Sequence, residues 1–374
     1  MAPTQAVLYE RISHALELSW SEAELPERER TKHVHRLHPY LGKFIPQLVE
    51  RLLERYVRLG GHVLDPFAGS GTTLVQALES DYDATGIDVA AFNALLMRVK
   101  TRVYDEILLE TELRDVLARL GCANGAPSGY AREWFAPRAA RELLHFRSLV
   151  ERYEHADVLR VVLARAARSA RLTKHFDLDF PRAPQREPYW CHKHRRTCRP
   201  VAQAEKFLAR YLVDTLGRLK EFQRVRARAR SARVVCGDAR DADLEGSYDG
   251  IVTSPPYPGL IDYHEQHRYA YELLELDDRR ERELGAAARG TSRAALDDYV
   301  EGISAVLRRC VAALAPGAPV VIVVNDRRHL YPEILRRSNL RVDERLERHV
   351  NRRTGRRAGE YFESVFVARA SVGR

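Results

Sequence analysis

The first hundred residues combine two spacings of hydrophobic positions. Apolar residues recur at helical spacing in residues 46–59, which predicts an amphipathic helix. Short, mostly apolar segments at residues 62–64 and 82–87 predict buried strands, and an aspartate follows each of them. Residues 72–79 and 90–100 have the spacing of helices. Strands that alternate with helices are typical of an α/β protein with a parallel sheet.

The last third of the chain continues this alternation and then changes it. Residues 233–236, 248–252 and 319–324 predict three further strands. Residues 340–350 and 361–368 predict an antiparallel hairpin, because a short glycine-containing loop separates two strand-like segments. The expected fold class is therefore α/β, with a mostly parallel sheet and a C-terminal antiparallel hairpin.

A long helical region lies between these two halves. Residues 102–232 are rich in arginine, and their apolar residues recur at helical spacing. The region is too long for a crossover between neighbouring strands. We therefore expect an inserted, mainly helical subdomain there. The remaining parts, residues 1–101 and 233–374, are expected to form the two halves of the sheet domain.

Composition narrows the class of protein. Of the 374 residues, 45% are hydrophobic, which is enough for a sizeable core. No segment approaches the roughly 18 to 20 apolar residues of a membrane span, and residues 1–10 lack a signal pattern, so we expect a cytoplasmic protein without a membrane partner. Five cysteines, an odd number, argue for a reducing compartment. The net charge of +9 suits a protein that binds a nucleic acid. An arginine-rich proteome would give the same charge without such a partner.

Residues 63–73 contain a glycine loop between a strand and a helix. Gly69 and Gly71 allow the backbone to turn tightly and to approach a ligand. The N–H groups at the start of the following helix suit a carboxylate or a phosphate. A phosphate-binding P-loop would need lysine where Thr72 stands, and a dinucleotide fingerprint would need glycine where Leu74 stands. Both of those functions are therefore excluded.

Residues 253–257 form a rigid corner after the strand at 248–252. The strand must stop at Ser254, because Pro255 and Pro256 lack N–H groups and have a fixed φ. The carbonyls of this corner and the Ser254 hydroxyl are expected to be free to accept hydrogen bonds. Tyr257 offers an aromatic face beside them, and acceptors beside a stacking face suit a planar base with an exocyclic amine. Taken alone, a proline pair is more often a simple turn.

The two motifs together resemble those of the amino-methylating DNA methyltransferases that use S-adenosyl-L-methionine. The first family motif, Asp-Pro-Phe-x-Gly-Ser-Gly-Thr-Thr, is matched by residues 65–73, and the catalytic motif Asp/Asn/Ser-Pro-Pro-Tyr/Phe by residues 254–257. The serine form is typical of members that methylate cytosine N4. The resemblance implies a Rossmann-like class I methyltransferase sheet, with the helical insertion as the target-recognition region. It also implies a prokaryotic, nucleoid-associated enzyme.

The resemblance also implies roles for individual residues. The segment with Lys43 and Phe44 is expected to pack over the methionine end of the cofactor, and Asp238 to contact its adenine. An acid at the end of the second strand, here Asp88, hydrogen-bonds ribose in nucleotide-type folds, and its alternative role is a helix cap. The expected cofactor contacts are Lys43, Phe44, Asp65, Phe67, Ala68, Gly69, Gly71, Thr72, Asp88, Asp238 and Ala239, and the expected catalytic residues are Ser254, Pro255, Pro256 and Tyr257.

Two basic segments are candidates for contact with DNA phosphates. The hairpin loop at 351–359 carries Arg352, Arg353, Arg356 and Arg357, which would suit a phosphate clamp or a solvated basic loop. The arginines between 224 and 233 could form a second stripe on a helix, or simply a solvated helix face. Residues 190–198 contain Cys191, His194 and Cys198, but their spacing matches none of the usual zinc patterns, so we expect a basic loop and no metal.

The expected reaction is methylation of a cytosine that has left the double helix. Ser254 Oγ and the Pro255 carbonyl would accept the two N–H bonds of its N4 amine, turning the nitrogen lone pair toward the methyl group. Adenine N6 and a base in RNA are alternative targets, and a non-catalytic DNA-binding protein is a third possibility. Double-stranded DNA is the expected partner, and a cognate restriction endonuclease acting separately is another.

Overall fold

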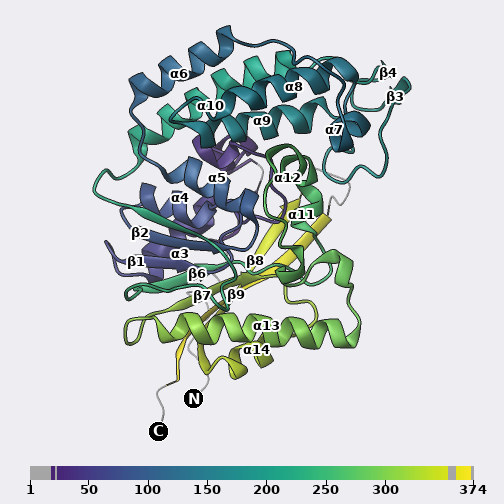
Figure 1. Ribbon diagram of the computed structural model, residues 1–374. Coiled ribbons are helices and arrows are strands. Elements are labelled where there is room, and N and C mark those ends of the chain that lie inside the picture. Colours follow the sequence, from purple (N-terminus) through teal and green to yellow (C-terminus); the bar gives the residue numbers. More distant parts are fainter. Residues whose placement is uncertain (1–17, 22, 353–358, 372–374) are drawn as a thin grey trace. The chain divides into compact units, whose positions relative to one another are not determined.

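The computed structural model describes residues 18–21, 23–352 and 359–371 (Figure 1). The chain forms two compact units. The first, which we call the sheet unit, takes its described residues from 1–89, 226–261 and 281–374, and the second, the helical unit, from 90–225 and 262–280. In the part of the chain that is described, no helix has both the length and the hydropathy needed to cross a membrane.

Within the described residues, the sheet unit contains a seven-stranded sheet in the order β5-β2-β1-β6-β7-β9-β8. Strands β1, β2, β5, β6 and β7 are parallel, and β9 runs antiparallel to both β7 and β8. The predicted α/β class and its closing hairpin are therefore confirmed. The strands are β1 (His62–Asp65), β2 (Asp83–Asp88), β5 (Ala232–Cys236), β6 (Gly250–Thr253), β7 (Val320–Val324), β8 (Leu340–Arg352) and β9 (Gly359–Ala370).

Helices cover the sheet, and Figure 1 shows α13 and α14 together along one side of it. Alternate side chains of β7, such as Val320 and Ile322, pack with Ile303 and Leu307 of α13 in one apolar cluster. The period of two along the strand sends Val321 to the opposite face. The helices are α2 (Glu27–Arg30), α3 (Pro46–Tyr56), α4 (Thr72–Glu79), α13 (Arg293–Ala312) and α14 (Tyr331–Arg337), with short 3₁₀ turns at His33–Arg36, Arg280–Arg282 and Ala287–Arg289.

The helical unit is built around α9, which packs against α5, α8, α10 and α12. Its described elements are α5 (Ala91–Thr101), α6 (Glu106–Ala118), α7 (Gly129–Trp134), α8 (Pro137–Val150), α9 (Ala156–Ala170), α10 (Glu205–Val225), α11 (Tyr263–Gln266) and α12 (Arg268–Leu274), and a small hairpin of β3 (Tyr189–Cys191) and β4 (Arg196–Cys198). Most of α9 is apolar and buried. One buried cation, Arg165, is held by Thr215 and by the Asp214 carboxylate of α10.

Candidate active site

The direction of chain progression reverses between β1 and β6. From β1 the sheet continues through β2 to β5 on one side, and through β6 to β7 on the other. Strand β1 pairs with β6 in register Leu64↔Ile251, so the two strands end side by side. Ligands of open α/β sheets bind at the carboxyl ends of strands at such a switch point. The glycine loop leaves β1 here, and the proline corner leaves β6.

Asp65 joins the two motifs. Its Oδ1 accepts hydrogen bonds from Thr253 Oγ1 at 2.6 Å and from the backbone N–H of Phe67 at 3.1 Å, and its Oδ2 accepts from Thr73 Oγ1 at 2.5 Å. Burial raises the pKa of Asp65 to about 6, although the three hydrogen bonds favour its ionised form. The carboxylate is 1% exposed and therefore faces protein donors rather than the crevice. It fixes the end of β1, the start of α4 and the end of β6.

The glycine loop adopts backbone angles that side chains disfavour. Gly69 has φ +51° and Gly71, immediately before α4, has φ +83°. A Cβ on Gly69 would lie 3.1 Å from the Tyr40 hydroxyl oxygen, so the segment before β1 closely approaches this turn. Asp88 Oδ2 accepts a hydrogen bond of 2.9 Å from the Gly69 N–H. Asp88, the residue expected to bind the ribose, therefore also holds the glycine loop in place.

The segment before α3 lies against α4 as well as the loop. The Glu79 carboxylate, at the end of α4, accepts from Lys32 Nζ at 2.6 Å and from His33 Nε2 at 3.1 Å. Lys43 Nζ donates to the His35 carbonyl at 2.7 Å, and burial lowers the Lys43 pKa to about 8. Within the described part of the chain no carboxylate pairs with Lys43, so its ammonium could donate a hydrogen bond to the carboxylate of a ligand. Phe44 next to it is half-buried.

The proline corner keeps only some of its acceptors for a ligand. Among the described residues the half-buried Ser254 hydroxyl has no hydrogen-bond partner, and the Pro255 carbonyl has no donor. The Pro256 carbonyl, however, accepts a hydrogen bond of 2.9 Å from the Tyr299 hydroxyl. The expectation that all carbonyls of the corner are free is therefore wrong for Pro256, and also for Tyr257, whose carbonyl accepts from the Leu260 N–H at 3.3 Å. Tyr299 is further bonded to Tyr331 at 3.1 Å, which makes the corner rigid.

Tyr257 is anchored at its polar end. Its hydroxyl donates to Glu363 Oε1 of β9 at 2.9 Å, and burial together with this carboxylate raises its pKa well above the ordinary value. Its half-buried ring packs on the apolar cluster that also contacts Phe67, so a residue from each motif rests on the same core. The sequence did not point to Glu363 as a partner. The available signal was a buried acid shortly before the apolar residues 365–368 of β9.

The end of β5 completes the site. The Gly237 N–H donates to the Asp88 carbonyl at 2.9 Å, which brings the next residue, Asp238, beside the end of β2. Both Asp238 oxygens accept from the Arg240 guanidinium, with Nε at 2.9 Å from Oδ1 and Nη2 at 2.5 Å from Oδ2. Oδ1 also accepts from the Arg240 backbone N–H at 2.9 Å, so most acceptor positions of this carboxylate are taken by protein donors. Ala239 is buried, like Ala68 and Thr72 of the first motif.

The basic segments differ from expectation. The arginines from 224 to 233 do not form a single helical stripe, because α10 ends at Val225. Arg226 is buried and donates to the Arg230 carbonyl, while Arg230 pairs with Asp81 at 2.9 Å. In the hairpin loop Arg352 ends β8, and the expected contacts Arg353, Arg356 and Arg357 lie outside the described residues.

Comparison with known proteins finds DNA methyltransferases among the relatives of this chain. Residues 7–94 match the DNA methylase family that groups N6- and N4-methylating enzymes. The chain is 35% identical to the type II methyltransferase M.MjaII of Methanocaldococcus jannaschii over 91% of its own length and 81% of that protein. It is 21% identical to M.BsoBI of Geobacillus stearothermophilus over 70% and 56% of the two chains. Among solved structures, TrmN of Thermus thermophilus matches with a TM-score of 0.36 and 14% identity, covering 88% of this chain and 50% of that one.

Proposed function

We propose that this chain, which belongs to the N6/N4 family of DNA methyltransferases, transfers a methyl group to the exocyclic N4 amine of cytosine. Membership of the family makes it an S-adenosylmethionine-dependent enzyme that acts on DNA. The choice of cytosine rests on Ser254 at the head of the catalytic motif, where members that methylate adenine typically carry an acidic residue.

The residues at the switch point fit the cofactor. S-adenosylmethionine supplies a methyl group already activated on a sulfonium. The turn at Gly69 has a positive φ and a Cβ there would lie within 3.1 Å of Tyr40, and the positive end of α4 suits the cofactor's carboxylate. We propose that Lys43 and Phe44 cover the methionine end, that Asp88 binds the ribose, and that Asp238 contacts the adenine. The further proposed contacts are Phe67, Ala68, Gly69, Gly71, Thr72 and Ala239. Asp65, whose oxygens face protein donors, is proposed to position the site.

The proline corner is proposed to bind the amine. Ser254 Oγ and the Pro255 carbonyl accept its two N–H bonds, which rotates the nitrogen lone pair out of conjugation and toward the methyl group. As the nitrogen becomes positive, these two oxygens stabilise the charge, because they are aimed at the atom where it develops. Tyr257, held by Glu363, stacks on the flipped base. Pro256 supports the corner through its bond from Tyr299.

The single observation that carries a shared site for cofactor and base is the bond between Asp65 and Thr253. It holds the glycine loop and the residue preceding Ser254 at one end of the sheet. The deciding experiment is transfer of labelled methyl groups to double-stranded DNA, followed by digestion to nucleosides. We expect label in N4-methylcytosine. Label in N6-methyladenine would reject the cytosine assignment, label only in RNA would reject the DNA substrate, and no label would reject the activity.

Contacts outside the sheet are proposals of the same kind. The helical unit is proposed to read the target sequence, because it provides helices that the methyltransferase sheet does not require. The end of the β8–β9 hairpin is proposed to contact DNA phosphates through Arg352, Arg353, Arg356 and Arg357. A cognate restriction endonuclease acting on the same sequence is the proposed functional partner.

A further inference from the structure

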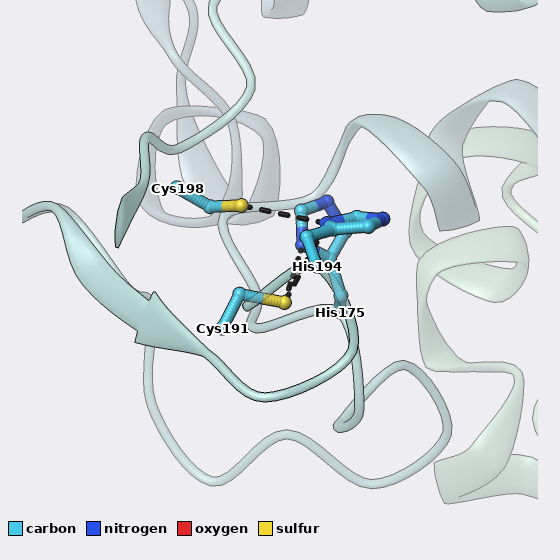
Figure 2. A group of neighbouring side chains, drawn as sticks. All are labelled: His175, Cys191, His194 and Cys198. Atoms are coloured by element: carbon cyan, nitrogen blue, oxygen red, sulfur yellow. Dashed lines mark hydrogen bonds between the residues drawn. The ribbon is translucent and has the colours of Figure 1, made fainter. Parts of the chain in front are cut away.

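A small hairpin in the helical unit brings four metal-binding side chains together (Figure 2). Cys191 ends β3 and Cys198 ends β4, while His194 lies in the turn between the strands. The fourth residue, His175, comes from the loop that precedes the hairpin, well separated in sequence from the other three. Figure 2 shows the two imidazole rings and the two sulfur atoms pointing toward one another.

The distances within this cluster are those of a tetrahedral site. Cys191 Sγ lies 3.4 Å from Nδ1 of His175 and 3.5 Å from Nδ1 of His194, and Cys198 Sγ lies 3.4 Å from the latter atom. All four ligand atoms lie within 4.8 Å of one another. Zinc bonds of about 2.3 Å to sulfur and about 2.0 Å to nitrogen, at tetrahedral angles, place neighbouring ligand atoms about 3.5 Å apart. One ion therefore fits among the four side chains with little movement of them.

We propose that His175, Cys191, His194 and Cys198 bind one structural Zn²⁺ ion. Two thiolates and two imidazoles are a donor set that favours zinc over the oxygen-binding ions Mg²⁺ and Ca²⁺. Four protein ligands complete the tetrahedron and leave no position for a substrate, so the ion holds the fold and takes no part in methyl transfer. Two thiolates also neutralise the charge of the ion, which allows it to lie beside Lys193, Arg195 and Arg196 of the same hairpin.

The hairpin needs a stabilising element of this kind. Its strands have three residues each, and an isolated two-stranded hairpin is marginally stable in water. Its own apolar cluster consists of Tyr189, Cys191 and Cys198. Trp190 is 56% exposed and adds little burial. A metal ion that ties both strands and the preceding loop together would supply the missing stability.

The neighbouring Tyr189 is compatible with the ion. Its hydroxyl accepts a hydrogen bond of 3.0 Å from the His175 backbone N–H and lies 2.9 Å from His175 Nδ1. When Nδ1 binds a metal, the hydroxyl keeps the backbone bond and directs its own proton elsewhere. Tyr189 therefore positions the loop that carries His175.

Another histidine cluster of the described residues, in the sheet unit, has a different character. His33, His35 and Glu79 also lie together. Glu79 already accepts from Lys32 Nζ at 2.6 Å and from His33 at 3.1 Å, and the group contains no thiolate. A carboxylate that pairs with an ammonium is a poor metal ligand. The proposal is therefore confined to the cluster in the hairpin.

The first test is the metal content of the full chain, purified without chelators and measured by mass spectrometry of the elements. We expect about one zinc per chain. The variants Cys191→Ser, Cys198→Ser, His175→Ala and His194→Ala should lose most of it. Two matched controls should keep it: Cys122→Ser, which removes an exposed thiol of the same unit, and His192→Ala, which removes an exposed histidine from the same turn. Equal zinc in the cluster variants and the controls would overturn the proposal.

The second test needs no variant and so does not depend on their folding. Cobalt exchanged into the unaltered chain should give the visible bands of a tetrahedral ion and the near-ultraviolet band of cobalt bound to thiolate. Absence of these bands, together with failure to retain added zinc, would overturn the proposal. So would peptide mapping that finds a disulfide between Cys191 and Cys198. Since these readouts do not involve methyl transfer, they stand apart from the proposed function.

Discussion

Thr253 donates a 2.6 Å hydrogen bond to Asp65, a residue 188 positions earlier in the chain. The bond crosses from the end of β6 to the end of β1, directly before Ser254. Because the carboxylate is buried and accepts two further bonds, it holds the glycine loop, α4 and the proline corner as one rigid group. Rigid placement of this kind lets two reacting groups meet in line without a further cost in ordering.

Replacing Thr253 with valine should disconnect the two motifs while keeping the shape of the side chain. The loss leaves a buried carboxylate with one donor fewer, so we expect stability to fall by about 1–3 kcal/mol. Turnover should fall further than cofactor affinity, because the corner carrying Ser254 is released while the glycine loop keeps its other bonds. Thermal unfolding, cofactor titration and initial rates measure the three effects. Equal losses in affinity and turnover would contradict the positioning role of the bond.

Asp65 should make stability depend on pH. Burial raises its pKa from 3.8 to about 6, so the folded chain keeps a proton that the unfolded chain releases. As the pH rises from about 4 to about 6, the carboxyl must ionise in its buried position, which costs free energy. The stability of the native state therefore falls relative to a chain that cannot ionise at this position. The Asp65→Asn variant is such a chain. Its stability relative to the unaltered protein should therefore improve by about 1–3 kcal/mol between pH 4.5 and pH 7. A difference that is constant across this range would show that Asp65 titrates normally.

Replacing Ser254 with alanine should separate binding from chemistry. We expect unchanged cofactor affinity and a loss of about 100-fold in turnover, since one of two groups that stabilise the developing charge is removed. Ser148→Ala, at an exposed position on α8, serves as the control and should retain full activity. A Ser254→Ala variant as active as this control would remove Ser254 from the mechanism.

Gly69 has a natural comparison in Gly129. Their φ values are +51° and +52°, but a Cβ at Gly69 would meet Tyr40 at 3.1 Å, whereas a Cβ at Gly129 would meet nothing within 4 Å. Changing either to alanine should cost about 1 kcal/mol of backbone strain. Only Gly69→Ala should also weaken cofactor binding, by about tenfold or more. Calorimetric titration of both variants tests this, and equal affinities would place the cofactor elsewhere.

The arginines at the end of the β8–β9 hairpin should act through salt-dependent attraction. Changing Arg352, Arg353, Arg356 and Arg357 to alanine should lower affinity for DNA of any sequence, and reduce the slope of log affinity against log salt by about 3 to 4. Changing Arg336 and Arg337, both paired with Glu333, should leave the slope unchanged. A fourfold variant with an unaltered slope would show that the loop does not touch phosphates.

Local signals in the sequence were enough for the sheet and for several helices. Strands β1, β2, β5 and β7 fall within one residue of expectation, because each is a short apolar segment with clear polar limits. Helix α4 begins and ends as predicted, at 72 and 79, since Gly71 fixes its start. Longer helices were less accurate: the helix from Pro46 ends at Tyr56, where Val57 turns extended and leads toward β1.

Residues that act through distant partners could not be found in this way. Ser254 and the glycine loop are contiguous motifs, so the sequence displays them. Tyr299 and Glu363 support the corner through bonds that span 43 and 106 positions, and nothing near them in the chain indicates a partner. His175 was missed for the same reason: the spacing of Cys191, His194 and Cys198 fits no usual pattern until a fourth ligand arrives from another loop.

The interleaving of the two units restricts how the chain can be divided. The polypeptide passes between them at 89/90, 225/226, 261/262 and 280/281. Neither unit is a continuous segment that could be excised and expressed alone, and the sheet itself draws on all three stretches of its unit. If a protease cut the chain at one of these four positions, strand pairing in the sheet would still hold the resulting fragments together. If the gene is split into two parts, neither fragment contains the whole sheet. The two fragments should therefore regain activity only when they are produced together.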